Sequence, residues 1–143
     1  MTNDRWRDLR TLVMGGAADC NEEAMETRRF RDLQVWQRSM GLAREVYRLT
    51  EGFPRGEQFG LVSQIRRAAV SVPSNIAEGR GRMTDKSFAV FLSQARGSLY
   101  ALQTQIELAG DLGFVAKEQV LPVMSEAEEI TCMIQGLVAT LRI

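Results

Sequence analysis

The stretch that decides the fold is FAVFLSQARGSLYALQTQIELAG, residues 88–110. Its apolar residues recur at alternating spacings of four and three, which places them on one face of a helix through successive heptads. These residues are Phe88, Leu92, Ala95, Leu99, Leu102, Ile106 and Ala109. Thr84 or Asp85 is a suitable N-cap for this helix. Gly97 and Ser98, near its middle, are small enough to permit a close crossing with another helix.

Residues 30–52 are apolar on two sides of an expected helix. The first stripe consists of Trp36, Met40, Ala43, Tyr47 and Thr50. The second, adjacent stripe consists of Val35, Leu42, Val46, Leu49 and Phe53. A helix with this much apolar surface is expected to pack against more than one neighbour. Gly52 and Pro54 are expected to end it.

Two more segments have helical spacing. One helix is expected to open near Glu57, to end at Gly79 and Gly81, and to bury Val62, Ile65, Ala69, Val72 and Ile76. Pro73 lies inside this stripe, and we expect a kink there because the apolar register continues beyond it. The last helix is expected from Ala116 to Leu141, with Pro122 bending its first turns or setting its start.

Alternation of apolar and polar residues, which would predict strands, is missing from this sequence. Four helices joined by short connections predict an all-α protein. Its expected form is an antiparallel up-down-up-down four-helix bundle over residues 30–143, with the second helix kinked at Pro73. Residues 1–29 differ, because GGAADCNEEA, residues 15–24, is typical of a linker. We expect residues 1–29 to be an N-terminal extension that is weakly ordered or forms a short helix.

Composition argues against several classes of function. The 143 residues include no histidine, which is the commonest general base and the commonest metal ligand. Cys20 and Cys132 lie far apart and form no CxxC pair, so neither a disulfide framework nor a zinc site is indicated. No run approaches the roughly 18 apolar residues that a membrane span needs. We therefore expect a cytoplasmic protein, not an enzyme, with no catalytic residues, no metal, no cofactor and no membrane association.

The net charge is zero, but the charges are unevenly distributed. Residues 53–97 carry seven basic residues against three acidic ones, whereas residues 104–143 carry two basic residues against six acidic ones. Arginine supplies 16 of the 18 positive charges, and it suits bidentate contacts with phosphate or carboxylate. The candidate nucleic-acid-binding residues are Arg66, Arg67, Arg80, Arg82, Lys86 and Arg96.

These motifs also have structural interpretations. GRGR, residues 79–82, lacks the spacing of a phosphate-binding fingerprint. It is either a helix-ending turn with solvated arginines or a contact for a phosphate backbone or an acidic partner. Of the adjacent Arg66 and Arg67, one is expected to pair with an acid inside the protein and the other to be a surface charge.

Other polar and aromatic residues are expected to serve the fold. Asn75 and Glu78 flank the expected kink, and Pro73 leaves the Ala69 carbonyl without its usual helical donor. A side chain from a neighbouring helix or a water is expected to supply that donor. Glu126, Glu128 and Glu129 are expected to form a solvated acidic face. Trp36 and Tyr47 are expected to pack in the core rather than to stack on bases.

Three stretches of the sequence carry a family pattern: FRDLQVWQRSMGLAREVY, QIRRAAVSVPSNIAEGRGR and FLSQARGSLYALQTQIELAGDLGF. They resemble the four-helix-bundle family of 23S rRNA intervening-sequence proteins, whose most specific block here is RRAAVSVPSNIAEG. That bacterial family is similar to the accessory variability determinant of diversity-generating retroelements. Those bundles assemble as a pentameric barrel that binds nucleic acid and a reverse transcriptase.

The resemblance implies a homo-oligomer, specifically a pentamer, with RNA, DNA or a nucleic-acid-processing protein as a further partner. The structural motif positions that it carries over are Pro73, Asn75, Glu78, Gly79, Gly97 and Ser98, beside Arg66, Arg67, Ser71 and Ile76. Ala101 departs from the pattern, because relatives tend to have a glutamate there. A charge partner for Arg66 or Arg67 is lost with it.

Two functions remain open. The first is binding of RNA or a ribonucleoprotein, in association with the ribosome, through an arginine-rich surface of the oligomer. It is motivated by the basic middle segment and by the family. The alternative is a protein–protein scaffold without nucleic-acid affinity of its own, because the two apolar stripes of residues 30–52 demand a partner.

Overall fold

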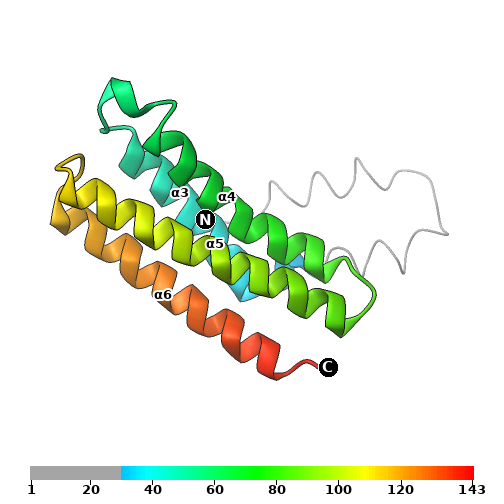
Figure 1. Cartoon of the computed structure of the whole chain (residues 1–143). Helices are drawn as coiled ribbons and strands as arrows, with labels where there is room; N and C mark the ends of the chain where they lie inside the picture. Colours follow the sequence, from blue (N-terminus) through cyan, green and yellow to red (C-terminus); the bar gives the residue numbers. More distant parts are fainter. Residues whose placement is uncertain (1–29) are drawn as a thin grey trace.

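The computed structural model describes residues 30–143, so the extension predicted for residues 1–29 lies outside the described part. Residues 30–143 form helices and no strand. The elements are α3 (Gln34–Thr50), the 3-10 turn η2 (Arg55–Glu57), α4 (Leu61–Arg80), α5 (Asp85–Asp111) and α6 (Lys117–Ala139). The four α-helices pack together along their lengths (Figure 1). The predicted all-α helical bundle is confirmed.

The helices form a closed ring of contacts. α3 packs on α4, α4 on α5, α5 on α6 and α6 on α3, and the contact between α4 and α5 is the most extensive. At one end, the connections 51–60 and 112–116 meet, with the Phe53 and Phe114 rings 6.0 Å apart. At the other end, the Arg142 backbone N–H donates to Asp85 Oδ2 at 3.0 Å, so the C-terminus lies beside the start of α5 (Figure 1).

The core lies where the apolar stripes of the four helices meet. All residues of the α5 seam, from Phe88 to Ala109, are buried, and so is the predicted stripe of α4. α6 contributes Val123, Ala127, Ile130 and Ile134, and α3 contributes Val35, Trp36, Leu42 and Val46. The helical spacing of apolar residues therefore identified the buried faces of α4 and α5.

Helix ends differ from the expectations in several places: α3 begins at Gln34 rather than at residue 30, and α6 ends at Ala139 rather than at Leu141. α4 begins at Leu61 rather than near Glu57, because Glu57 lies in η2 and its Oε2 accepts the Leu61 N–H at 3.1 Å. α6 begins at Lys117, so Pro122 lies inside the helix and does not set its start. The predicted N-cap of α5 is confirmed, since Thr84 Oγ1 accepts the Ser87 N–H at 3.1 Å. α4 continues through Pro73 to Arg80, and the kink at that residue stays a prediction.

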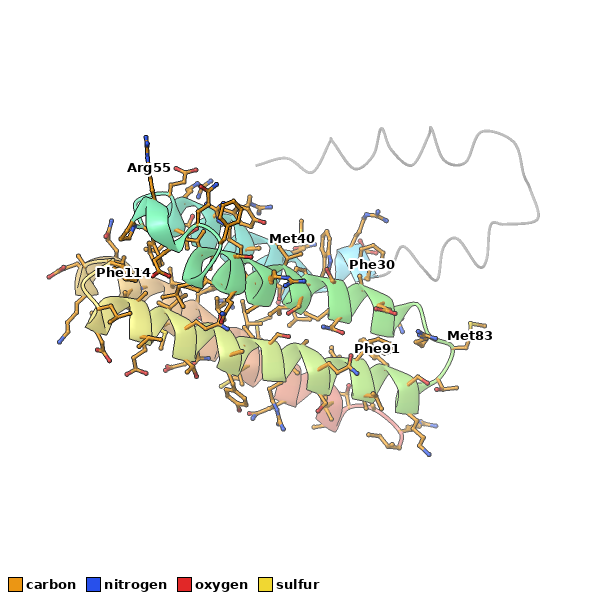
Figure 2. The ribbon with its side chains drawn as sticks, turned by 45° about the horizontal axis from the view of Figure 1, so that its top comes forward. Phe30, Met40, Arg55, Met83, Phe91 and Phe114 are labelled. Atoms are coloured by element: carbon orange, nitrogen blue, oxygen red, sulfur yellow. The ribbon has the colours of Figure 1, made fainter. Side chains whose placement is uncertain are left out.

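Two glycines have roles that differ from those expected. Gly79 does not end α4 but lies inside it, where a Cβ atom would stand 2.5 Å from Phe91 Cβ and 3.0 Å from Phe88 Cδ2. α4 therefore approaches α5 closely at Gly79, opposite Phe91, which is labelled in Figure 2. No helix of residues 34–139 makes the close crossing predicted at Gly97 and Ser98, because Gly97 is exposed and its Cβ would meet nothing within 4 Å. The Ser98 hydroxyl donates to the Gln94 carbonyl of its own helix.

Candidate functional site: the basic turn and the α3–α4 groove

The predicted cationic residues do not form one surface. Arg80 ends α4, Arg82 follows in the turn and Lys86 lies in the first turn of α5, so these three share one end of the bundle. We call them the basic turn. Arg66 lies about 21 Å from Arg80 along α4, at 1.5 Å per residue. Arg96 lies on α5 and lines a separate groove of about 240 Å³ between α5 and α6.

Aromatic rings hold the arginines of the basic turn. The Arg80 guanidinium lies 5.9 Å from the centroid of the Phe88 ring, and that of Arg82 lies 5.0 Å from the centroid of Phe91. Arg82 Nη2 also donates to Glu78 Oε1 at 3.3 Å, an exposed pair of a kind that contributes little to stability. The guanidinium edges and the exposed Lys86 remain open to an anion.

Arg66 joins α4 to α3 and has no acidic partner in the described structure. Its Nε donates to Thr50 Oγ1 at 2.9 Å and its Nη2 donates to the Tyr47 carbonyl at 3.3 Å. Its guanidinium also lies 4.5 Å from the centroid of the Tyr47 ring. The predicted acid pair is therefore wrong, because the last turn of α3 supplies a hydroxyl, a carbonyl and a ring instead. Arg67 is exposed, as expected of a surface charge.

Polar residues around Pro73 bond within their own helix. Asn75 Nδ2 donates to the Ser71 carbonyl at 2.8 Å, and the Ser74 hydroxyl donates to the Val70 carbonyl at 2.8 Å. The Ser71 hydroxyl donates to the carbonyl of Ala68. These bonds serve carbonyls on both sides of that of Ala69, and they give Asn75 a local role within α4.

The acidic residues of α6 were expected to form a solvated face, but two of them pair with an arginine of α3. Arg38 of α3 makes a bidentate contact with Glu126, Nε to Oε1 at 2.9 Å and Nη2 to Oε2 at 2.7 Å. Its Nη1 also donates to Glu129 Oε1 at 2.9 Å. The hydrogen bond and the charge of Arg38 lower the pKa of Glu129, and the two glutamates raise the pKa of Arg38. Glu128 and Glu129 are exposed, as predicted for an acidic face, whereas Glu126 is half-buried.

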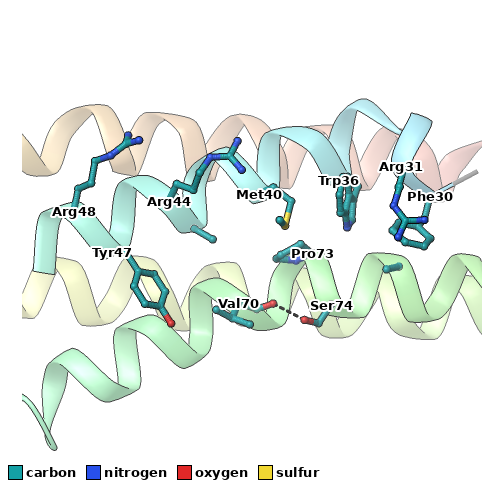
Figure 3. Close-up of a pocket in the computed structure, with 12 residues that line it drawn as sticks. Phe30, Arg31, Trp36, Met40, Arg44, Tyr47, Arg48, Val70, Pro73 and Ser74 are labelled. Atoms are coloured by element: carbon teal, nitrogen blue, oxygen red, sulfur yellow. Dashed lines mark hydrogen bonds between the residues drawn. The ribbon is translucent and has the colours of Figure 1, made fainter. Parts of the chain in front are cut away.

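An open groove of about 640 Å³ separates parts of α3 and α4, and we call it the α3–α4 groove. Figure 3 shows Trp36, Met40 and Tyr47 extending from α3 toward α4, with Val70 and Pro73 opposite them. The remaining lining residues are Phe30, Arg31, Ala43, Arg44, Arg48, Ser74 and Ala77. The prediction that Tyr47 packs in the core is wrong, since it is 42% exposed in this groove, whereas Trp36 is buried as predicted.

The arginines of the groove were missed when charge was counted over residues 53–97. Arg44 and Arg48 lie one turn apart on α3, beside the apolar stripe (Figure 3). Arg48 pairs with Glu45, while no carboxylate of residues 30–143 forms an ion pair with Arg44. Arg31 lies 4.6 Å from the centroid of Phe30 at the other end of the groove. Arg44 and Arg48 stand four residues apart beside the apolar stripe, and this spacing was the sequence signal that could have revealed a basic rim.

Binding, through apolar surface and guanidinium groups, is the chemistry that these two sites offer. Among residues 30–143, no group of three His, Cys, Asp or Glu side chains is arranged to hold a metal ion. In the same part of the chain, no helix is both long and apolar enough to cross a membrane.

Comparison with known proteins adds the following. The family described as 23S rRNA-intervening sequence protein matches residues 31–136. A crystal structure of a protein with unknown function from the S23 ribosomal protein family of Bacteroides thetaiotaomicron has a TM-score of 0.67 and 20% sequence identity. The similarity covers 74% of this chain and 99% of that chain, and at this identity it shows the fold alone. No curated protein matches the chain.

Proposed function

The chain belongs to the family of 23S rRNA-intervening sequence proteins, and from this premise we propose that it is a cytoplasmic, non-enzymatic bundle that binds RNA or a ribonucleoprotein as a homo-oligomer. The observation that carries the proposal is the basic turn, where Arg80, Arg82 and Lys86 gather at one end of the molecule. Phosphate is its expected ligand, because arginine and lysine contacts to the phosphate backbone supply most sequence-independent affinity for nucleic acid.

Neighbouring groups strengthen the basic turn. Phe88 and Phe91 hold two of its guanidinium groups, which lowers the entropy lost when they meet a phosphate. The Arg142 backbone bond to Asp85 brings another arginine to the same end, although the sequence places it in the acidic tail. Exposed Met83 lies between the charged residues (Figure 2) and offers apolar surface to an unstacked base.

The homo-oligomer is supported by the outward face of α5, which carries no charge from residue 90 to residue 108. We call it the α5 outer face, and it consists of Val90, Gln94, Gly97, Ala101, Thr104 and Leu108. Val90 is 52% exposed and Leu108 is 48% exposed. The face is thus uncharged and exposes two large apolar side chains, and exposed apolar surface among polar residues is typical of a contact with another protein. Gly97 and Ala101 at its centre allow the backbone of a second helix to approach.

The test of RNA binding is fluorescence anisotropy with a labelled oligouridine and with a labelled stem-loop of a 23S rRNA intervening sequence, over a range of salt concentrations. The double substitution Arg82→Ala/Lys86→Ala is expected to weaken binding. It should also lower the slope of log K against log salt by about 1.4 for a single strand, at about 0.7 per phosphate contact. The matched control Arg55→Ala/Lys117→Ala removes one exposed arginine and one exposed lysine at the opposite end, and should bind as the unmodified protein does.

Two results would refute RNA binding at this site: no binding at low salt, or equal losses in the two double variants. The scaffold function would then be favoured, since the α5 outer face supports it without RNA. Light scattering tests that face separately. Ala101→Lys is expected to reduce the oligomer mass, whereas Ser125→Lys, on an exposed position of α6, should leave it unchanged.

A further inference from the structure

We infer that the α3–α4 groove is the docking site for an acidic stretch of this same chain, DCNEEAME at residues 19–26, folded back along α3. The contact is intramolecular, and it is distinct from the basic turn and from RNA binding. Three observations carry it: the open apolar surface of the groove, the charge of its rim, and the point at which the chain enters it.

The groove presents apolar side chains that neighbouring helices leave uncovered. Tyr47 and Val70 are each 42% exposed there, although both lie on the facing sides of packed helices (Figure 3). Met40 is half-buried between them and Pro73. Covering this surface is favourable by about 25 cal/mol for each Å² removed from water. An occupant with small or flexible apolar residues therefore fits the floor.

The charge of the rim selects an acidic occupant. Arg44 and Arg48 lie along the α3 side of the groove, where Glu45 is the one acid that pairs with either among residues 30–143. Residues 19–26 carry Asp19, Glu22, Glu23 and Glu26 and no basic residue. Ala24 and Met25 stand side by side between Glu23 and Glu26, and methionine adapts well to irregular apolar surfaces. The charge of the stretch thus complements the arginines beside the groove, and its apolar residues suit the apolar surface of the groove.

The length of the chain before Phe30 fits the spacing of the arginines. Phe30 lines the groove at one end, and Arg44 and Arg48 lie about 15 Å and about 21 Å along α3 from its first residue, Gln34, at 1.5 Å per residue. Glu23 precedes Phe30 by seven residues, which span up to about 23–25 Å when extended. Asp19 precedes it by 11 residues, which span up to about 36–40 Å. An extended chain therefore has the length to bring Glu23 toward Arg44 and Asp19 toward Arg48.

The tether favours this stretch over a free partner. A segment joined to the groove by a few residues is present at an effective concentration of millimolar order, without any further contact. A free acidic peptide of equal intrinsic affinity would need that concentration to compete.

Disulfide trapping of the full chain tests the inference, because Cys20 lies within the proposed stretch. In a Cys132→Ser background, Val70→Cys places a thiol in the α3–α4 groove, and Ala139→Cys places one at the exposed end of α6, outside both the groove and the α5 outer face. Both positions are exposed, and Ala139 lies near the start of α5, at the end of the bundle where α4 also ends. With diamide as the oxidant, the intramolecular disulfide from Cys20 should form about tenfold faster with position 70, the ratio that about 1.4 kcal/mol of docking free energy gives.

Charge provides the second arm of the test. Glu22→Lys/Glu23→Lys is expected to remove the preference for position 70 and to leave the rate at position 139 unchanged. Raising the salt concentration should act in the same direction. Equal rates at the two positions, a preference that ignores both charge and salt, or disulfide-linked dimers in place of the intramolecular product would each overturn the inference. The last result would assign the groove to a segment of a second copy.

Discussion

Gly79 provides the sharpest test of the packing between α4 and α5. The substitution Gly79→Ala adds one Cβ atom, which would lie 2.5 Å from Phe91 Cβ and 3.3 Å from Phe91 Cγ. Carbon atoms in contact prefer about 3.5–4.0 Å. Phe91 Cβ is attached to the backbone and cannot rotate away, so the two helices must separate by about 1 Å, the shortfall from that preferred contact.

The expected change in stability combines two opposing effects. Overpacking of a well-packed core costs about 1–3 kcal/mol, and here the cost should lie near the upper end because the nearest atom is fixed. Alanine in place of glycine inside a helix gains about 1 kcal/mol. The free energy of unfolding should therefore fall by about 1–2 kcal/mol.

Gly136→Ala is the matched control. It makes the same chemical change within α6, but the added Cβ meets nothing within 4 Å, so the helix gain of about 0.5–1 kcal/mol should appear alone. Urea unfolding followed by far-UV circular dichroism, at one protein concentration, measures both variants, and the m-value should not change. If Gly79→Ala is as stable as the unmodified protein, or if Gly136→Ala loses as much, then the close approach at Gly79 does not exist.

Three further predictions concern polar contacts. Arg66→Ala should lower the free energy of unfolding by about 2 kcal/mol, because two hydrogen bonds and a cation–π contact with α3 are lost. Arg67→Ala should change it little, and equal effects of the two substitutions would contradict the role of Arg66 in joining α4 to α3. The pKa of Glu129 is lowered in the folded state, so its pairing with Arg38 stabilises the protein above the ordinary glutamate pKa and stops doing so as the pH falls through the lowered value. Glu129→Gln should therefore destabilise at neutral pH and not in acid, as urea titrations at several pH values would show. Thr84→Ala should cost about 1 kcal/mol and Thr84→Ser much less, measured by thermal unfolding.

Buried positions were predictable from the sequence because burial follows the helical repeat. The seam from Phe88 to Ala109 required nothing beyond its spacing. The same repeat also predicts that Gly97 is exposed. It lies two residues before Leu99 and hence about 200° around the helix from it, on the outward face. Gly79 differs, since its role depends on which residue of α5 stands opposite, and no single helix carries that information.

The groove and the Arg66 contacts were not predictable, for different reasons. α3 has more apolar surface than α4 and α6 can cover, and the spacing between helices decides that Tyr47, rather than Val46, stays exposed. Arg66 bonds to the Tyr47 carbonyl, a group that every residue possesses, so no residue type signals the partner. Charge complementarity in sequence suggested an acid instead. Contacts to backbone and ring surfaces appear only once the helices are placed.

The placement of the helices also changes what a net charge of zero implies. The acids of α6 lie on the helix diagonal to α4, since α6 packs on α5 and α3 in the described bundle. Adjacent helix axes lie about 8–10 Å apart, so diagonal axes are separated by about 11–14 Å. This exceeds the screening length of about 8 Å at physiological salt. Arg38 further neutralises Glu126 and Glu129 locally. The negative charge of α6 therefore does little to cancel the field at the end of α4, and overall neutrality does not argue against a polyanion at the basic turn.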